Sequence, residues 1–295
     1  MSELVVVADE VGEALAAGRG VVALETTLVA HGFPAPDGLE VAAASEREVR
    51  AAGAVPATIG VLDGRITVGL DPDQLARFTA DARKVGPRDL AACAAQGVVG
   101  ATTVAGTLAV AREVGIRFLG TGGIGGVHRG FPTPPDVSAD IPLLGRAAAL
   151  VVSSGAKSLL DVPATMELLE TLGVPVLGFR TDVLPLFYSA DGGPAVPSRV
   201  EDAIEAARIA AAHWELGGAG LLLANPPPES VDVEGLIEEA LAEAREQGVS
   251  GQAVTPFVLA ALHERSGGRT RDVNRKLVVA NARLAAEVAV AFAAV

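Results

Sequence analysis

The sequence reads Ala149-Leu150-Val151-Val152-Ser153-Ser154-Gly155-Ala156-Lys157-Ser158 at residues 149–158, an apolar run followed by small residues and a single lysine. The run Ala149–Val152 predicts a buried strand, as found in sheets that helices cover on both faces. The small residues after it place Lys157 against apolar backbone. Burial disfavours the charged form of an amine, and the free amine is the nucleophile of Schiff-base chemistry. The alternative is that Lys157 caps a helix or reaches solvent.

Other strand-like runs occur along the chain, and alanine-rich helical stretches separate most of them. They are Val21–Leu24, Ala57–Leu62, Ile116–Leu119, Val174–Gly178 and Gly220–Ala224. This alternation predicts an α/β fold, an α/β/α sandwich with a largely parallel central sheet. Asp63-Gly64 has the chemistry of a two-residue hairpin turn, so the sheet is expected to be mixed. No repeat or linker divides the sequence, and we expect a single domain over residues 1–295.

Capping residues and prolines mark several helix boundaries. Expected boundaries are Asp37 for the helix Gly38–Ala52, Asp71 or Asp73 for a helix to Ala82, and Thr255-Pro256 for a later helix. A last helix is expected from about Asp272 nearly to Val295. The Gly/Pro-rich stretch Ser189–Pro197 predicts a flexible loop that could act as a lid.

The amino-acid composition limits the classes of function that this protein can have. Hydrophobic residues make up 50% of the 295 residues and aromatic residues only 3%, so Ala, Val, Leu and Ile must build the core. The net charge of −13 disfavours nucleic acid as a partner, and an anionic substrate would need a local cluster of Lys and Arg. Cys93 is the only cysteine, which excludes an internal disulfide and suits a reducing, cytoplasmic environment. Neither export nor a membrane span is expected.

Charged residues follow predicted strands, at the sheet edge where open α/β folds bind ligands. Glu25 ends the first strand, and burial there would raise its pKa and suit it to general acid catalysis. The alternative is that Glu25 caps the next turn. Lys84 and Arg88 lie around a helix start and could hold a phosphate, or they could form a solvated helix end.

A glycine-rich loop, Gly120–Gly130, follows another strand and would let backbone N–H groups approach a ligand closely. His128 stands in place of the third glycine of the dinucleotide fingerprint, so the loop alone does not predict a nucleotide cofactor. Beyond the loop, Asp136-Val137-Ser138-Ala139-Asp140 offers two carboxylates, one of which could bind a hard divalent cation. Alternatively, Ser138 or Asp140 caps the next helix.

Motifs spread over nearly the whole chain resemble the pseudouridine-5′-phosphate glycosidase family, also called the indigoidine synthase A-like family. The matching segments are Ala23-Leu24-Glu25-Thr26-Thr27 with His31-Gly32, Pro56-Ala57-Thr58-Ile59, Lys84-Val85 with Arg88-Asp89-Leu90, Gly100-Ala101-Thr102-Thr103-Val104-Ala105, Thr121–Gly130, Asp136–Asp140, Ser154-Gly155-Ala156-Lys157-Ser158 and Thr255-Pro256-Phe257. The resemblance implies an α/β/α sandwich and a homotrimer with sites near subunit boundaries.

The resemblance also implies roles for the matching residues. Lys157 falls at the nucleophile, Glu25 at the proton donor, and Asp136 at the ligand of a divalent ion, usually Mn²⁺. The implied substrate-binding residues are Lys84, Val104, Thr121, His128, Ser138, Ala139, Asp140 and Asn274. Asn274 is followed by Arg275-Lys276, where the family has apolar or neutral residues.

The implied reaction is the reversible cleavage of pseudouridine 5′-phosphate to uracil and ribose 5-phosphate. A carbon–carbon bond joins its base to its sugar, so an imine between the sugar and lysine would serve as the electron sink. Lys84, Arg88 and Arg129 are expected to face the phosphate. Two other interpretations stay open: a two-carboxylate nucleotide N-glycosidase that uses Glu25 and Asp140, and a nucleotide-binding protein without catalysis.

Overall fold

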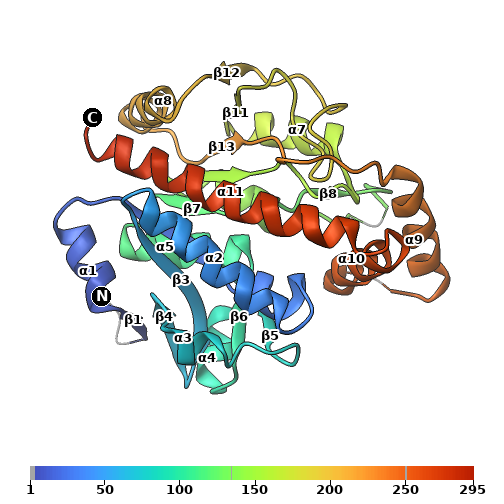
Figure 1. Cartoon of the computed structure of the whole chain (residues 1–295), viewed down its shortest axis with the longest axis horizontal. Helices are drawn as coiled ribbons and strands as arrows, with labels where there is room; N and C mark the ends of the chain where they lie inside the picture. Colours follow the sequence, from blue (N-terminus) through green and yellow to red (C-terminus); the bar gives the residue numbers. More distant parts are fainter. Residues whose placement is uncertain (1–3, 134, 250) are drawn as a thin grey trace.

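The computed structural model describes residues 4–133, 135–249 and 251–295. Its largest element is one mixed sheet (Figure 1). The strands of this sheet are β1 (Val5–Val7), β2 (Val21–Glu25), β3 (Val55–Leu62), β4 (Arg65–Val68), β5 (Arg83–Val85), β6 (Gly100–Thr102), β7 (Phe118–Gly120), β9 (Leu150–Ser153), β11 (Val176–Phe179), β12 (Ser198–Val200) and β13 (Leu221–Ala224). Their order is β1-β4-β3-β2-β7-β9-β13-β11-β12, and β6 pairs with β3 and β5.

Parallel pairing predominates in this sheet. Within the described part of this sheet, only β3 pairs antiparallel, with β4 and with β6. Asp63 and Gly64 join β3 to β4 with φ of 52° and 76°, the left-handed pair that a type I′ hairpin turn needs. The predicted fold class is confirmed, and each predicted strand is present with bounds shifted by at most two residues.

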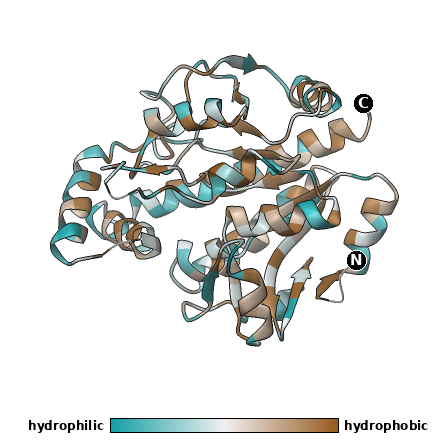
Figure 2. Ribbon diagram, turned by 180° about the vertical axis from the view of Figure 1, so that it is seen from behind, coloured by the Kyte–Doolittle hydropathy of each residue, from teal (hydrophilic) through white to brown (hydrophobic). Residues whose placement is uncertain are grey.

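Helices cover both faces of the sheet because successive strand residues point to opposite sides. Leu24 packs on the face covered by α2 (Asp37–Ala51), α8 (Ala203–Glu215) and α11 (Arg269–Phe292). Its neighbour Ala23 packs with residues from the opposite layer. That layer consists of α1 (Asp9–Ala16), α5 (Val104–Val114), α6 (Asp140–Leu144) and α7 (Val162–Thr171). Viewed from behind, predominantly hydrophobic strands lie between the helices (Figure 2).

The last helix, α11, runs across the middle of the sheet beside α2 (Figure 1). Its N-terminal end lies next to α10 (Val254–Arg265), which packs against α9 (Glu234–Glu246). A long final helix was predicted from about Asp272, and the structure begins it three residues earlier, at Arg269. The helix packs against β2, β7 and β9 and brings residues of the C-terminal region to the centre of the fold.

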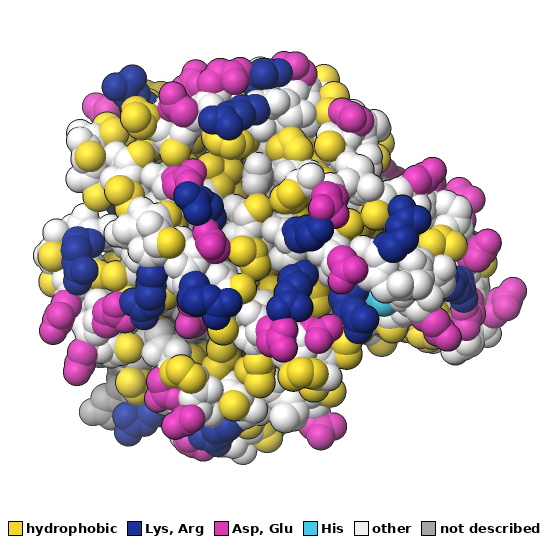
Figure 3. Space-filling model, viewed as in Figure 1, with side chains coloured by type: hydrophobic (Ala, Val, Ile, Leu, Met, Phe, Trp, Pro, Cys, Tyr) yellow, Lys and Arg dark blue, Asp and Glu magenta, His cyan; other side chains and the backbone are white. Residues whose placement is uncertain are grey.

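Ion pairs join the exposed sides of α2 and α11. Arg275 pairs with Glu40 at 2.6 Å and Arg283 with Glu48 at 2.9 Å. On this face basic and acidic side chains alternate, as Figure 3 shows. Asp37 does not cap α2 as predicted; it is the first helical residue, and its carboxylate lies 3.5 Å from Arg271.

The helix after Asp71 is shorter than expected. Asp71 caps α3 (Pro72–Leu75) by accepting from the Gln74 N–H at 2.8 Å, but the helix ends well before Ala82. The chain turns after α3 and buries Phe78 against Gly60 of β3, where no larger residue than glycine would fit. α10 begins at Val254, which makes Pro256 its third residue rather than its first.

The loop Ser189–Pro197 connects β11 to β12. Several of its residues line a cavity of about 1040 Å³ that also contains Arg129 and Tyr188. None of them lines the candidate site described below, so the loop is not a lid over that site in this structure. Among the described residues, no helix is both long and apolar enough to span a membrane.

Candidate active site

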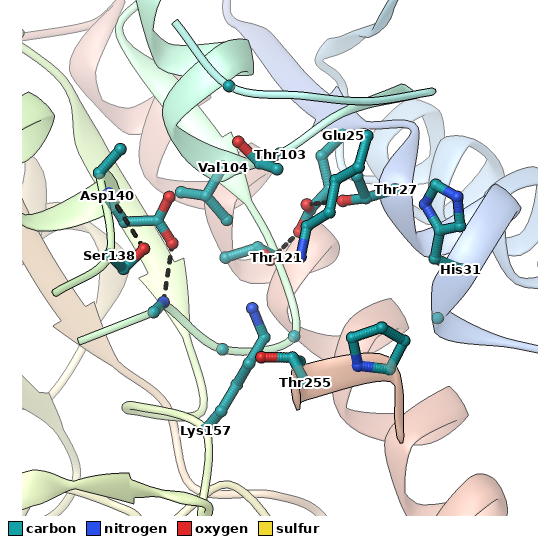
Figure 4. A pocket seen from close by; sticks show the side chains of 18 of the residues that line it. Glu25, Thr27, His31, Thr103, Val104, Thr121, Ser138, Asp140, Lys157 and Thr255 are labelled. Carbon is teal, nitrogen blue, oxygen red and sulfur yellow. Dashed lines mark hydrogen bonds between the residues drawn. The ribbon is translucent and has the colours of Figure 1, made fainter. Parts of the chain in front are cut away.

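A cavity of about 520 Å³ opens at the carboxyl ends of β2, β7 and β9. Parallel strands bring the segments that follow them to one edge of the sheet, so residues far apart in sequence meet there (Figure 4). The residues to which the family resemblance assigns catalysis, substrate binding or metal binding all line this cavity: Glu25, Lys84, Val104, Thr121, His128, Asp136, Ser138, Ala139, Asp140, Lys157 and Asn274.

Glu25, the last residue of β2, is 6% exposed. The hydroxyls of Thr27 and Thr121 each donate to one of its carboxylate oxygens. Burial raises the pKa of Glu25 above its ordinary value, while the positive charge of Lys157 and the two hydroxyl donors act in the opposite direction. A protonated carboxyl is therefore available here at a higher pH than on the surface, as general acid catalysis requires.

Lys157 lies in the loop that follows β9, and its side chain extends into the cavity (Figure 4). Backbone hydrogen bonds fix this loop against the glycine-rich loop: Ser154 N–H donates to Gly122 O at 2.8 Å, and Lys157 N–H donates to Ile124 O at 3.1 Å. Gly155 has φ of 75°, and a Cβ there would lie 1.9 Å from the carbonyl oxygen of Pro185. Glycine is thus required for the turn that directs Lys157 inward.

Asp140 is 4% exposed and connects two walls of the cavity. One of its carboxylate oxygens accepts the N–H of Ala105 at 2.9 Å, and the other accepts the N–H of Gly125 at 2.7 Å. Ser138 Oγ accepts the N–H of Asp140 at 3.2 Å. The capping alternative is wrong: the N-cap residue of α6 is Ala139, no side chain that the structure describes caps the helix, and the Asp140 side chain turns away from its own helix.

The cationic residues of the site differ from the expected set. Lys84 lines the cavity, and burial lowers its pKa, helped by the nearby charge of Lys157. Arg88 lies on the rim with an 80% exposed side chain. Arg129 does not line this cavity: its guanidinium donates to Ser158 O at 2.9 Å and to Glu234 at 2.8 Å. The expectation that Arg129 faces the ligand is therefore wrong, because these partners hold it outside the cavity.

Asp136 and His128 face each other, with Oδ2 of Asp136 3.8 Å from Nδ1 of His128. Burial lowers the pKa of His128, although the Asp136 carboxylate opposes this shift. A partly exposed carboxylate beside a neutral imidazole suits a hard cation that keeps most of its ligands as water. Within the described residues, no group of three or more His, Cys, Asp or Glu side chains is placed to hold a metal.

Asn274 enters the cavity wall from α11 and is 2% exposed. Its Oδ1 atom is buried and has no hydrogen-bond partner. The two residues after it, which depart from the family pattern, point elsewhere: Arg275 pairs with Glu40, and Lys276 pairs with Glu229. The departure therefore changes the surface of α11 and leaves the position of Asn274 intact.

Sequence reasoning missed Phe187, which lines the cavity and is 3% exposed. Its φ is 62°, which is unusual for a residue with a side chain. A Cβ on Gly123 would lie 2.5 Å from its ring, so the glycine leaves room for this aromatic wall. No pattern near Phe187 in the sequence signals the position, because it depends on a long connection between β11 and β12.

The family model described as "Indigoidine synthase A like protein" matches residues 10–291. The chain belongs to this family. Two curated relatives of this indigoidine synthase A-like chain are both named "Pseudouridine-5′-phosphate glycosidase". The protein from Paracoccus denitrificans is 47% identical, over 99% of this chain and 100% of its own length. The protein from Herpetosiphon aurantiacus is 48% identical, over 97% of both chains.

Two solved structures share the family fold. The prealnumycin C-glycosynthase AlnA, in complex with ribulose 5-phosphate, superimposes with a TM-score of 0.90 at 43% identity, covering 100% of this chain and 98% of its own. An indigoidine synthase A-like protein from Thermotoga maritima gives a TM-score of 0.88 at 38% identity, with 98% and 97% coverage. The expected family membership is confirmed over nearly the full length of the chain.

Proposed function

We propose that this chain is a pseudouridine-5′-phosphate glycosidase, which reversibly converts pseudouridine 5′-phosphate to uracil and ribose 5-phosphate. The full-length relatives support this activity by their names and their identity of 47% and 48%. The observation that carries the mechanism is the pairing, in one cavity, of the Lys157 amine with the buried carboxyl of Glu25. These groups supply a nucleophile and a proton donor.

The reaction follows from these two groups. The Lys157 nitrogen attacks the anomeric carbon, and a C–N bond forms as the bond from this carbon to the ring oxygen breaks. The proton that the nitrogen loses passes to the ring oxygen, so that the sugar opens. The nitrogen lone pair then forms a C=N bond while the carbon–carbon bond to the base breaks, and Glu25 gives its proton to the departing carbon. Water hydrolyses the imine, which restores the amine and frees ribose 5-phosphate. No oxidant or reductant is required at any step.

The contacts of Asp140 favour this mechanism over the two-carboxylate N-glycosidase. That alternative needs a second carboxylate free to activate water or attack the sugar. Both oxygens of Asp140 already accept backbone N–H groups, from Ala105 and Gly125. Asp140 is therefore better suited to fixing the cavity walls than to proton transfer.

The cations of the cavity suit the phosphate of the substrate. Lys84 is half-buried among the site residues and Arg88 lies at the rim, in a chain whose net charge of −13 repels anions elsewhere. A charge-assisted hydrogen bond to phosphate is stronger than a neutral one, so Lys84 contributes most where water is excluded. Phe187 offers a flat apolar surface of the kind that packs against a planar base.

We assign the divalent-cation site to Asp136, with His128 beside it, and expect Mn²⁺ or Mg²⁺ there. Such an ion would offset the negative charge of a bound phosphate. The binding of Mn²⁺ can be followed by electron paramagnetic resonance, and Asp136→Asn should weaken it at least about tenfold. Lys276→Met, outside the cavity, serves as the control. Equal Mn²⁺ binding by the native protein, Asp136→Asn and Lys276→Met would show that Asp136 is not a ligand of the ion.

The family resemblance further supports a homotrimer, and the single buried cysteine suits a cytoplasmic protein. Light scattering after size-exclusion chromatography measures the oligomer directly. A mass of one or two chains would contradict the trimer.

Uracil release from three substrates at matched concentration tests the activity. Pseudouridine 5′-phosphate should react fastest, unphosphorylated pseudouridine about 10³-fold more slowly in kcat/KM, and uridine 5′-phosphate should bind but turn over far more slowly. Preference for uridine 5′-phosphate would indicate an ordinary nucleotide N-glycosidase. If none of the three substrates releases uracil, the interpretation as a nucleotide-binding protein without catalysis would be favoured.

A further inference from the structure

Asn281 on α11 is fully buried and lies behind the candidate active site, outside its lining. Its Nδ2 atom donates to the carbonyl oxygens of Thr121 and Gly122 at 2.8 and 3.3 Å, and its distance to Ser154 Oγ is 3.2 Å. Its Oδ1 atom accepts from Asn225 Nδ2 at 2.9 Å. One side chain thus contacts three separate strand ends.

The orientation of this amide is determined by its partners. Carbonyl oxygens can only accept hydrogen bonds, so the atom of Asn281 that faces Thr121 and Gly122 must be Nδ2. Asn225 presents its own Nδ2 to the other side, where Oδ1 accepts. Exchanging the two atoms would place an oxygen against two carbonyls and leave the donor of Asn225 facing another donor.

These contacts hold together the two loops that carry the reacting groups. Thr121 begins the glycine-rich loop, and its hydroxyl donates to Glu25. Ser154 precedes Lys157 in the loop after β9, and its N–H donates to Gly122 O at 2.8 Å. Both loops therefore converge on Asn281, although it touches neither Glu25 nor Lys157.

We propose that Asn281 is a positioning residue for catalysis, which holds the Thr121 loop and the Lys157 loop in one fixed arrangement. The inference rests on the proposed function for its kinetic consequences. Misplacing a reacting group by about 1 Å can lower turnover about 10²-fold while substrate contacts persist. Thr121 and His128 belong to the loop that Asn281 holds, but Lys84, the residue that we expect to bind the phosphate, lies on another element. Loss of Asn281 should therefore lower kcat more than it raises KM.

The pH profile provides a signature of this role. The groups that act on the charge of Glu25 are Lys157, Lys84 and Asp140, together with the two hydroxyl donors. If the Thr121 loop shifts, Glu25 loses a donor that favours its charged form, and its pKa rises further. Because Glu25 acts as an acid, activity falls as pH rises through that pKa, so the alkaline limb should move to higher pH.

The test compares Asn281→Leu with Leu284→Ala, a buried substitution on the same helix that touches neither loop. We expect kcat for uracil release to fall about 10- to 100-fold in Asn281→Leu, with KM changed less than about threefold. Its alkaline limb should move to higher pH, as it should in Thr121→Val. Leu284→Ala should lower thermal stability but keep the kcat and pH profile of the native protein.

Hydrogen–deuterium exchange gives a readout that does not depend on the activity. Peptides covering residues 121–128 and 153–158 should exchange at least about tenfold faster in Asn281→Leu than in Leu284→Ala. If Asn281→Leu does not fold, Asn225→Ala replaces it in the test. This variant removes the hydrogen bond to Asn281 Oδ1, so the same peptides should exchange faster than in the native protein, but by a smaller factor.

Unchanged exchange in both loops, or a lowered kcat with an unmoved alkaline limb, would overturn the proposal. Lack of uracil release by the native protein would instead refute the proposed function, and exchange would still decide whether Asn281 fixes the loops.

Discussion

Gly125 donates its backbone N–H to one carboxylate oxygen of Asp140 at 2.7 Å. The other oxygen accepts from Ala105 at 2.9 Å, so the start of α5 and the glycine-rich loop converge on one buried carboxylate. This arrangement gives Asp140 two fixed donors before any ligand arrives. The chemical steps are then left to Glu25 and Lys157.

Asp140→Asn should separate the two glycosidase mechanisms. The substitution places an amide nitrogen against one backbone N–H, and an unsatisfied buried polar group costs about 1–3 kcal/mol of folding stability. In the lysine mechanism the variant is less stable and slower but still forms the imine. Thermal unfolding and borohydride trapping measure the two effects. Complete loss of turnover in a folded variant, with no imine trapped in the variant or in the native protein, would return Asp140 to a direct catalytic role.

Lys157→Ala should abolish uracil release, because the variant lacks the amine that attacks the anomeric carbon. Borohydride added during turnover of the native protein should reduce the imine and leave a ribose-phosphate adduct on Lys157, which mass spectrometry locates. Lys157→Arg should not restore activity, since a permanently charged guanidinium cannot form an imine. Lys276→Ala is the matched control. An active Lys157→Ala protein would rule out the covalent mechanism.

Glu25→Gln should lower kcat about 10²-fold or more while the substrate still binds, because the amide keeps the shape of the carboxyl but has no acidic proton. The alkaline limb that Glu25 contributes to the pH profile should disappear in this variant. Stopped assays of uracil across the pH range measure both effects. Weakened binding with unchanged turnover would instead make Glu25 a substrate-positioning group.

The same substitution should change how stability depends on pH. Burial raises the pKa of Glu25 in the folded chain, so the folded state keeps a proton that the unfolded chain has released. Stability is therefore lost as pH rises from the unfolded pKa of about 4.3 through the raised folded pKa. Glu25→Gln lacks this loss and should melt at a higher temperature than the native protein at neutral pH. Calorimetry at several pH values tests this, and equal melting curves at all of them would contradict it.

Lys84→Met should reduce the preference for a phosphorylated substrate. The variant keeps much of the side-chain volume but removes the half-buried charge, so kcat/KM for pseudouridine 5′-phosphate should fall about 10²-fold or more. Unphosphorylated pseudouridine should lose much less. Lys276→Met removes the same charge from the outer surface and should leave both values unchanged. An equal loss of kcat/KM for both substrates would show that Lys84 does not bind the phosphate.

Much of this site could be predicted from the sequence because its residues follow apolar strands. Glu25 and Lys157 each stand at or just after a run that could only be a buried strand, and parallel pairing brings such ends together. The family resemblance supplied the residues that local patterns do not reveal, such as Val104 and Asn274. Both lie in the same cavity as the strand-end residues.

Other features depended on tertiary contacts that leave no local pattern. Arg129 looked like a phosphate ligand because it ends a glycine-rich loop, but carbonyl and carboxylate partners turn it outward. Phe187 faces the cavity because the long connection between β11 and β12 places it there, with Phe187 itself in the left-handed backbone conformation. Asn281 lies in a helix, and its neighbours in sequence do not show whether its side chain is buried or exposed. Its hydrogen bonds to residues far away in the sequence, such as Thr121, identify it as a buried amide.

The position of α11 has a consequence for the newly synthesised protein. Asn274 and Asn281 come long after Lys157 along the chain. Asn274 nevertheless lines the cavity at the ends of β2, β7 and β9, and Asn281 bonds to the segments that follow β7 and β9. Ribosomes build a chain from its N-terminus, so the strands and Lys157 emerge while the helix that completes their surroundings is still unmade. A partly synthesised chain thus carries the reactive amine without its finished pocket, and competence for catalysis arrives only when the final helix docks.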